Sequence, residues 1–203
     1  MYAVLGIGNP GAKYVNTKHN AGFIIIDRFV DKHKLHYQPS KSQYYFAEGK
    51  LNKNDFIIIR PTTYVNNSGL AALDVLDKFE IPVNRLLVVV DDINLEIGKL
   101  RLRKSGGSGG HNGLESIIYY LQSDHFPRIR FGIGADFEEG FQADYVLSKF
   151  SSDELNSLKL NFDFAVELIE NFINGGLKGI TDHFSKYSIE FNREKPPHER
   201  EEN

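Results

Sequence analysis

The sequence predicts one α/β domain, a three-layer α/β/α arrangement on a twisted, mixed and mostly parallel sheet. Short apolar runs typical of strands alternate along the chain with longer segments of helical periodicity, an order that produces parallel strands covered by helices. The clearest run, LLVVVDD at 86–92, is almost wholly apolar, as expected of a strand buried on both faces. The 203 residues fit one such domain, which we place at 1–190. Residues 191–203 are polar and include Pro196-Pro197, so we expect a disordered tail there.

Each element is expected from its local pattern. Strands should occupy the short apolar or alternating stretches at 3–7, 44–50, 55–60, 86–92, 97–103 and 129–134. Helices should occupy the amphipathic stretches at 21–34, 68–79, 112–121 and 153–174. Turn-forming residues at 52–55 separate two strand patterns, which predicts a hairpin. Ligands of such sheets bind outside the carboxyl ends of the strands, so the loops that follow the strands are candidate functional segments.

Composition excludes several classes of site. The chain has no cysteine, which excludes disulfides and cysteine-ligated zinc. No apolar run approaches the roughly 20 residues that a membrane span needs, and MYAVLGIGNPG does not resemble a targeting leader, so we expect a cytoplasmic protein. The net charge of −3 argues mildly against nucleic-acid binding. The cations are nevertheless clustered, which leaves room for a local cationic surface, at Lys99, Arg101, Arg103, Lys104, Arg128 and Arg130.

The glycine motif at 6–11 (GIGNPG) fits G-x-G-x-x-G, the pattern of dinucleotide-binding loops. In those loops a helix begins near the third glycine, and an acidic residue ends the second strand about 20 residues later. Here the polar stretch AKYVNTKHN follows Gly11, and Asp27 and Asp31 lie inside an expected helix. The pattern therefore favours a substrate loop or a structural turn over a dinucleotide site.

A second glycine motif at 106–110 (GGSGG) fits G-x-S-x-G, the pattern that presents a nucleophilic serine. The preceding segment KLRLRK has a charged face, unlike the buried strand that normally carries such a serine. Glycines around Ser108 more naturally let the backbone approach a bulky ligand. A serine esterase that uses Ser108 remains an alternative hypothesis.

A third pattern is spread along the chain, at junctions between strands, loops and helices. It combines one imidazole, one carboxylate and several amides, from Asn9, His19, Asn66, Asp91 and Asn112. Such groups suit acyl transfer to water, because a histidine can take a proton near neutral pH, a carboxylate can hold its tautomer, and amide NH₂ groups can stabilise an oxyanion.

Each member of this set also has a simpler interpretation. Asn66 and Asn112 fit the N-caps of two expected helices. Asp91 and the following aspartate fit a solvated turn, and His19 fits an exposed loop histidine. The spacing alone leaves these alternatives open.

The chain resembles the bacterial peptidyl-tRNA hydrolase family from residue 3 to about residue 185. The resemblance is carried by GIGNPG at 6–11, TKHNAGF at 17–23, RPTTYVNNSG at 60–69, DDINLEIGKLRLR at 91–103, GGSGGHNGL at 106–114 and RIRFGIG at 128–134. Both glycine motifs fall inside these segments, which weakens the dinucleotide and serine interpretations.

The resemblance implies an esterase that acts on N-blocked aminoacyl ends of tRNA, without a cofactor and without a metal. His19 would be the catalytic base and Asp91 its orienting partner, with Asn9 in the cleft around the scissile ester. Substrate-binding residues would be Tyr14, Tyr64, Asn66, Asn112, Arg101, Arg103 and Arg130, the arginines holding acceptor-stem phosphate. We expect Arg101 and Arg103 on one strand face, since they have equal parity. A monomer is expected, and a catalytically silent RNA-binding protein of this fold is the other alternative.

Some residues depart from the family pattern or stay without an assigned role. Val65 stands where methionine is common, Asn67 where an apolar residue is common, and Lys18 where arginine is common. For His111 we expect a structural or tRNA-contacting role, although a second base is an alternative. The other histidine pair, at 33 and 36, is not expected to bind a metal.

Overall fold

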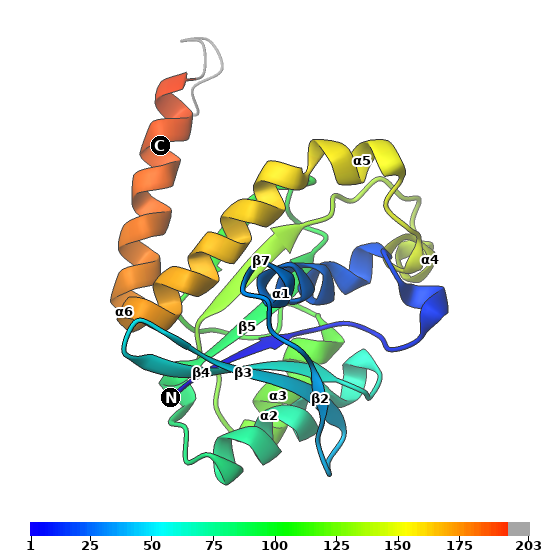
Figure 1. Ribbon diagram of the computed structural model, residues 1–203. Helices are drawn as coiled ribbons and strands as arrows, with labels where there is room; N and C mark the ends of the chain where they lie inside the picture. The colour runs from blue at the N-terminus through cyan, green and yellow to red at the C-terminus, as the bar shows by residue number, and fades with distance from the viewer. Residues whose placement is uncertain (195–203) are drawn as a thin grey trace.

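The computed structural model describes residues 1–194 and contains one seven-stranded sheet between two layers of helices (Figure 1). The order across the sheet is β2-β3-β4-β1-β5-β7-β6. The strands are β1 (Tyr2–Gly6), β2 (Gln38–Pro39), β3 (Tyr44–Leu51), β4 (Asn54–Pro61), β5 (Leu86–Asp92), β6 (Leu100–Arg103) and β7 (Arg128–Gly132). The three-layer α/β/α prediction is confirmed.

Parallel pairing occupies the centre of the sheet and antiparallel pairing both edges. The pairs β1–β4, β1–β5 and β5–β7 are parallel, whereas β2–β3, β3–β4 and β6–β7 are antiparallel. The sheet is therefore mixed, as predicted, and the expected hairpin joins β3 to β4. Its turn contains Asn52 with a positive φ of 54°, a conformation that asparagine tolerates better than most residues.

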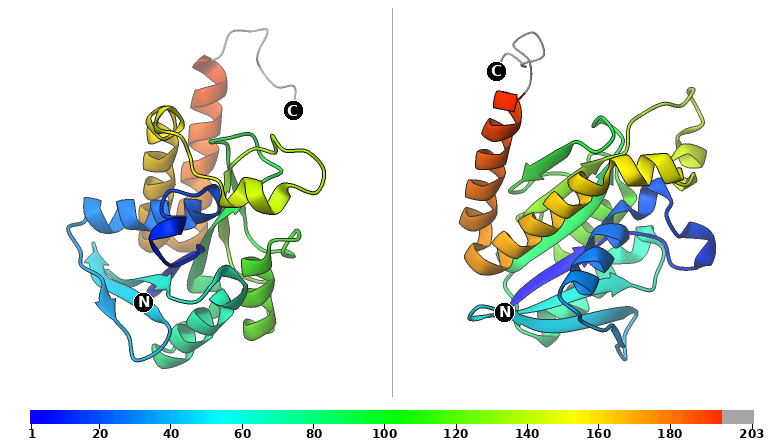
Figure 2. Two further views of the ribbon diagram at one scale, coloured as in Figure 1. Left: turned by 90° about the vertical axis from the view of Figure 1, so that its right-hand side faces the viewer. Right: turned by 45° about the horizontal axis from the view of Figure 1, so that its top comes forward.

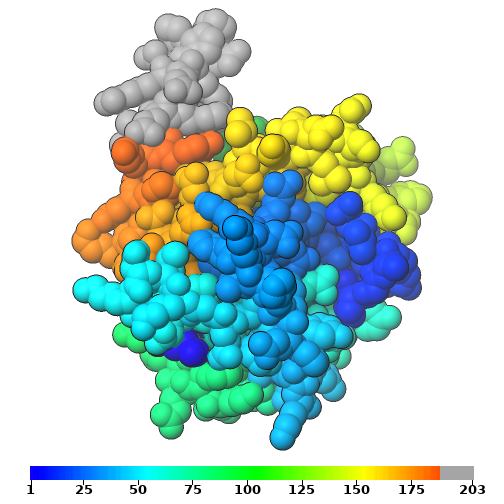
Figure 3. All heavy atoms as spheres, in the orientation of Figure 1, coloured from blue at the N-terminus to red at the C-terminus, as the bar shows by residue number. Residues whose placement is uncertain are grey.

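Helices cover both faces of the sheet, because the central strands alternate apolar side chains to either side. Leu87 and Val89 of β5 pack with α1 (Ala21–Lys32) and α6 (Lys159–Glu194) on one face. Val88 and Val90 pack with α2 (Ser68–Lys78) and α3 (Asn112–Leu121) on the other. Two views show these layers from different sides (Figure 2), and the space-filling view shows α1 (blue) lying against α6 (orange) (Figure 3).

Some predicted strands and helices have different bounds in the structure. The strand expected at 97–103 begins only at Leu100, because Gly98 turns the chain with φ 80°. The helix expected at 153–174 is two helices, α5 (Ser152–Ser157) and α6, and a further short helix, α4 (Gln142–Leu147), precedes them. A capping box of Ser151 and Glu154 begins α5, and Leu158, the C-cap of α5, separates it from α6.

The long helix α6 contains a kink at Gly176, whose φ of 60° and ψ of −150° are not helical. Beyond it the chain turns back along the first part of α6 (Figure 1). The ring of Tyr187 thereby stacks on Phe164, with 3.6 Å between centroids. α6 extends to Glu194, so the first four residues of the predicted tail are helical, and residues 195–203 lie outside the described part of the chain. No helix in residues 1–194 is long and apolar enough to cross a membrane.

Candidate active site

The candidate site lies where three adjacent parallel strands end. The loops after β1, β4 and β5 meet at one edge of the sheet, which is where ligands bind in folds of this type. The start of α1 packs directly onto this edge, since a Cβ on Gly22 would lie 2.5 Å from the carbonyl oxygens of Ile7 and Val89. Glycine at this position therefore permits the close approach that brings the turn before α1 next to the end of β5.

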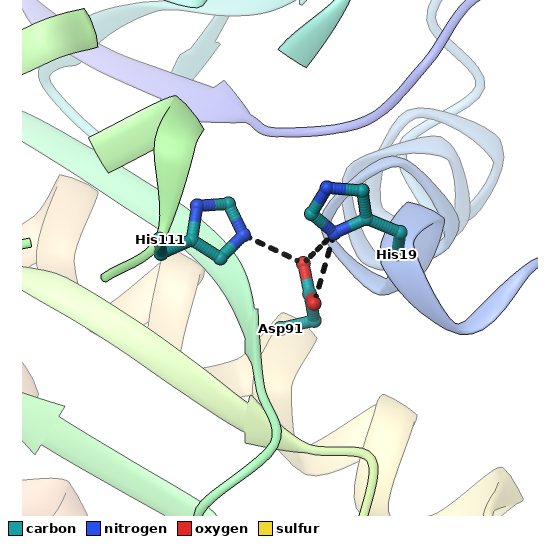
Figure 4. Close-up of side chains that lie close together, drawn as sticks. All are labelled: His19, Asp91 and His111. Atoms are coloured by element: carbon teal, nitrogen blue, oxygen red, sulfur yellow. Dashed lines mark hydrogen bonds and ion pairs between the residues drawn. The ribbon is translucent and has the colours of Figure 1, made fainter. Parts of the chain in front are cut away.

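His19 and Asp91 form the centre of the site. His19 lies in the short 3₁₀ turn Lys18–Asn20, and its Nδ1 is 3.0 Å from each carboxylate oxygen of Asp91 (Figure 4). The side chains are 15% and 3% exposed, so this pair is shielded from most of the solvent. The interpretations of His19 as an exposed loop residue and of Asp91 as a solvated turn are wrong.

Electrostatic interactions shift the pKa values of both members. Burial alone would raise the pKa of Asp91, but its electrostatic interactions and hydrogen bonds with His111 and His19 outweigh burial and hold that pKa well below the usual range. Burial alone would lower the pKa of His19, but the charge and hydrogen bond of Asp91 outweigh it and raise that pKa above the ordinary 6.5. With Nδ1–H donating to Asp91, the free nitrogen of neutral His19 is Nε2.

A second histidine completes this cluster. His111 Nε2 lies 3.0 Å from Asp91 Oδ1, and the two imidazole centroids are 5.0 Å apart (Figure 4). His111 Nδ1 accepts hydrogen bonds from the backbone N–H groups of Gly113 at 3.1 Å and Leu114 at 3.4 Å, so this side chain is the N-cap of α3. The sequence placed His111 beside Asn112 but did not reveal its contact with the carboxylate.

The side-chain amide oxygen of Asn9 faces the loop that follows β4. The backbone N–H of Val65 donates to Asn9 Oδ1 at 3.1 Å. Asn20, a residue that sequence reasoning missed, fixes the backbone of Asn9 by accepting from its N–H at 2.8 Å and donating to its carbonyl at 3.0 Å. In the described part of the chain no group bonds to the NH₂ of Asn9, which leaves that donor available to a ligand.

The other amide residues and the two tyrosines occupy the rims of adjacent loops. Asn66 is an exposed residue of the 3₁₀ turn Val65–Asn67, and Asn112 is the exposed first residue of α3. Neither caps a helix: the N-cap of α3 is His111, and the N-cap position of α2 is Asn67. The capping interpretation of Asn66 and Asn112 is therefore wrong.

Tyr14 and Tyr64 lie edge to face, with ring centroids 6.2 Å apart and an interplanar angle of 85°. They come from loops 50 residues apart, those after β1 and β4, so the fold alone brings them together. Tyr64 is 55% exposed, and the pair presents an aromatic surface to solvent. Such a surface suits stacking against a ring or packing against an apolar group.

A cleft of about 200 Å³ lies on the face of β6 and β7 and is lined mainly by arginines and glycines, namely Arg101, Arg103, Arg128, Arg130, Ser105, Gly106 and Gly107. Arg101 lies opposite Arg130 in the antiparallel register and Arg103 opposite Arg128, so all four share one face of the sheet. The predicted common face of Arg101 and Arg103 is confirmed.

Two of these arginines form hydrogen bonds within the protein. Arg130 Nη1 pairs with Asp92 Oδ2 at 2.9 Å, and its Nη2 donates to the carbonyl of Ser108 at 3.0 Å. Arg128 is 1% exposed and donates to four carbonyls, including those of Gly106 and Gly107. Sequence reasoning missed this role of Arg128 in anchoring the glycine loop. Arg101 and Arg103 have no such partners among the described residues, so they carry the free positive charge of the cleft.

Both glycine motifs differ from the catalytic patterns they resemble. Gly11 leads into the short turn Ala12–Tyr14, and the first long helix begins only at Ala21, so the dinucleotide geometry is absent from the described chain. The hydroxyl of Ser108 accepts from the N–H of Gly110 at 3.3 Å, and within residues 1–194 no imidazole contacts it. Ser108 therefore lacks the base that a nucleophilic serine requires.

Lys18 has a structural role that the sequence did not indicate. Its ammonium pairs with Glu154 at 3.3 Å and lies about 5 Å from two aromatic rings, 5.2 Å from Tyr145 and 5.1 Å from Phe150. The backbone N–H of Lys18 also donates to the carbonyl of Ser148 at 2.9 Å. The turn that carries His19 is thus fastened to the segment that contains α4 and α5.

The histidines also bear on metal binding. His19, Asp91 and His111 have ligand atoms within 4.8 Å of one another, a grouping that sequence spacing did not reveal. Because His111 Nδ1 accepts two N–H groups, its Nε2 carries hydrogen and presents no lone pair toward this centre. His33 lies near a carboxylate after all, Glu170 at 2.9 Å, in a contact that joins α1 to α6.

The fold and site together define a three-layer α/β protein that pairs a histidine–aspartate couple, suited to hydrolytic proton transfer, with a cationic cleft. A family model described as "Peptidyl-tRNA hydrolase" matches residues 3–194. The chain belongs to the peptidyl-tRNA hydrolase family.

Individual relatives agree with this assignment. The peptidyl-tRNA hydrolase of Lachnospira eligens is 40% identical over 178 residues, which cover 88% of this chain and 96% of that protein. The one from Caldanaerobacter subterraneus is 38% identical over 91% of this chain and 100% of its own length. The crystal structure of peptidyl-tRNA hydrolase from Acinetobacter baumannii matches with a TM-score of 0.84 at 28% identity, covering 90% of this chain and 93% of the other.

Proposed function

We propose that this protein hydrolyses the ester between tRNA and a peptide or N-blocked amino acid, with water as the nucleophile and His19 as general base. The observation that carries this proposal is the contact of His19 Nδ1 with both oxygens of Asp91 at 3.0 Å. This contact favours the tautomer in which Nε2 can accept a proton. Membership of the peptidyl-tRNA hydrolase family supplies the substrate.

In the proposed reaction, Nε2 of His19 takes one proton from water while the water oxygen bonds to the ester carbonyl carbon. The carbonyl π electrons move to its oxygen and form a tetrahedral oxyanion. The intermediate collapses by breaking the bond to the ribose oxygen, which receives the proton from His19. The products are a free carboxylate on the peptide side, a ribose hydroxyl on the tRNA and a released proton.

The amide side chains are suited to the oxyanion and to the peptide. The NH₂ group of Asn9 is available because Val65 holds the other end of its amide. A preorganised donor of this kind stabilises developing negative charge. We assign Asn9 to this role, and Asn66 and Asn112 to contacts with the water and the ester or peptide carbonyls. Tyr14 and Tyr64 would line the same cleft.

The arginine cleft is suited to a phosphate of the tRNA acceptor stem. Arg101 and Arg103 offer the guanidinium groups, while Arg130, predicted as a third binding residue, lines the cleft as it holds the glycine loop. Guanidinium binds phosphate through paired charge-assisted hydrogen bonds. A tRNA substrate also fits the predicted cytoplasmic location, and a monomer remains our prediction.

The direct test is to incubate the protein with N-acetylaminoacyl-tRNA and to measure the appearance of free tRNA. We expect release of tRNA and of the N-acetylamino acid in equal amounts. A protein that binds this substrate without cleaving it would instead be the silent RNA-binding alternative. The hydrogen-bonded His19–Asp91 pair supports the enzyme over that alternative.

The pH dependence should report the environment of His19. Because Asp91 raises the pKa of His19 above 6.5, the neutral, proton-accepting form should become dominant only at a pH above that value. The acidic limb of kcat/KM should therefore have its midpoint above 6.5. Rates of tRNA release across a pH series, at substrate concentrations below KM, provide the measurement. A midpoint below 6.5 would show that Asp91 does not stabilise the protonated form.

Removing Arg101 and Arg103 together should weaken tRNA binding. We expect the double alanine variant to raise KM for N-acetylaminoacyl-tRNA about ten- to a hundredfold and to reduce its salt dependence, because fewer counterions are released on binding. The kcat should change little, since the cleft does not contain the reacting groups. Steady-state kinetics at several salt concentrations check both parameters.

The matched control removes two exposed cations elsewhere, Lys78 at the end of α2 and Arg85 immediately before β5. That variant should keep the KM of the wild type. A substrate reduced to an N-blocked aminoacyl-adenosine should also respond equally weakly to both double variants. Equal KM changes for long and short substrates would mean that the arginines do not bind tRNA phosphate.

A further inference from the structure

His111 is the side chain in the active-site cluster that the proposed mechanism does not use. Its two nitrogens have different partners: Nδ1 the backbone of α3, and Nε2 the carboxylate of Asp91 (Figure 4). We propose that His111 is a positioning residue, which the start of α3 locks as an Nε2–H donor so that it fixes the orientation of Asp91 beneath His19. This inference rests on the proposed role of His19 as the base.

The tautomer of His111 follows from its partners. Gly113 and Leu114 can only donate their backbone N–H groups, so Nδ1 must accept and must lack a hydrogen. The hydrogen of neutral His111 is then on Nε2, where it points at Asp91 Oδ1 at 3.0 Å. Protonation of Nδ1 would remove the cap from two N–H groups at the start of α3. The helix therefore favours the tautomer that carries its hydrogen on Nε2.

This donor restricts Asp91. The ionisable side chains in hydrogen-bond contact with the Asp91 carboxylate are two within residues 1–194, His19 from the turn before α1 and His111 from the start of α3. His19 touches both oxygens, whereas His111 touches Oδ1 alone, so His111 breaks the symmetry of the carboxylate. Without His111 the carboxylate could rotate about its terminal torsion and would share its charge with His19 alone.

Two consequences for His19 follow. A carboxylate that loses one donor attracts the proton of His19 more strongly, so the acidic limb of kcat/KM should move to higher pH. A less restrained carboxylate also holds the imidazole less well for attack, so kcat should fall. A residue that merely capped α3 would change the stability of the fold and leave both properties of His19 alone.

Two substitutions separate the cap from the donor. In His111→Asn the short side chain can still accept from the N–H groups of α3, because asparagine is a favoured N-cap, but it is too short to reach Asp91. In His111→Gln the longer amide can reach Asp91 with an N–H, but glutamine is a poor N-cap. The first variant keeps the helix start and loses the donor, and the second does the reverse.

The experiment measures kcat/KM against pH for N-acetylaminoacyl-tRNA, together with the melting temperature. We expect His111→Asn to melt close to the wild type, to lose about tenfold in kcat/KM at neutral pH, and to shift its acidic limb to higher pH. We expect His111→Gln to have a melting temperature about 3 °C lower than that of the wild type. The midpoint pH of its acidic limb should stay closer to the wild-type value than that of His111→Asn. A wild-type rate and pH profile in His111→Asn would overturn the proposal, as would equal limb shifts in both variants.

Nitrogen NMR of the histidines tests the arrangement without substrate and in the wild-type chain. We expect neutral His111 with hydrogen on Nε2 and neutral His19 with hydrogen on Nδ1. Hydrogen on Nδ1 of His111 at neutral pH would overturn the proposal even if the variants failed to fold. If the wild type bound N-acetylaminoacyl-tRNA without releasing tRNA, the proposed function would fail, while this spectrum would still decide the arrangement of His111.

Discussion

Replacing His19 with alanine should lower kcat for N-acetylaminoacyl-tRNA at least about a hundredfold. General-base catalysis contributes roughly this much or more, and within residues 1–194 no other free imidazole nitrogen is found in the hydrogen-bonded cluster around Asp91. The KM should change little, because the side chain acts on water in the transition state and the tRNA is held elsewhere. Steady-state kinetics at a pH above the acidic limb of the wild-type profile give both constants.

The fold should survive this substitution. His111 still donates to Asp91 in the variant, so the buried carboxylate keeps a partner. A melting temperature near that of the wild type would verify it, and tRNA binding should remain normal. Near-normal turnover in a folded His19→Ala protein would remove His19 from the mechanism.

Replacing Asp91 with asparagine should lower kcat about a hundred- to a thousandfold. The carboxylate accepts from both histidines, whereas an amide has one oxygen to accept and an NH₂ that must donate. Because α3 keeps His111 as a donor, the amide oxygen of the variant should face His111 and its NH₂ should face His19. Nδ1 of His19 would then accept, and its hydrogen would move to Nε2, the nitrogen needed as the base.

A matched control for this substitution is Asp74→Asn in α2. Asp74 also accepts hydrogen bonds from two side chains, Ser42 at 2.7 Å and Tyr44 at 2.8 Å, but within residues 1–194 it bonds to no histidine. That variant should keep the wild-type kcat. Normal turnover in Asp91→Asn would mean that Asp91 has no part in holding His19.

Most of the central fold could be predicted from the sequence because it depends on local periodicity. The uninterrupted apolar run of β5 and the amphipathic pattern of α1 each reflect burial that the residues themselves dictate. Two boundaries were less predictable: β6 starts late because Gly98 has a positive φ, and α5 ends at its C-cap Leu158 within a continuous helical pattern. The kink of α6 likewise depends on one residue, Gly176.

The sequence predicted which residues belong to the site better than it predicted the contacts between those residues. His19 and Asp91 are 72 residues apart, so their pairing follows from the sheet and from the family resemblance, and no local pattern contains it. The double role of His111 was missed because histidine is not among the favoured capping residues, and its carboxylate partner Asp91 comes from β5, 20 residues earlier in the chain. Arg128 was missed because its carbonyl partners come together only when the glycine loop folds over β7.

The most direct test of the central claim is the turnover of N-acetylaminoacyl-tRNA by two variants side by side, His19→Ala and Ser108→Ala. Both substitutions remove a group that could activate or replace water, but only His19 has the carboxylate partner that a base requires. We predict that Ser108→Ala releases free tRNA at close to the wild-type kcat while His19→Ala is at least about a hundredfold slower. Loss of activity in Ser108→Ala, with His19→Ala still active, would contradict water activation by His19 and would indicate a serine esterase instead.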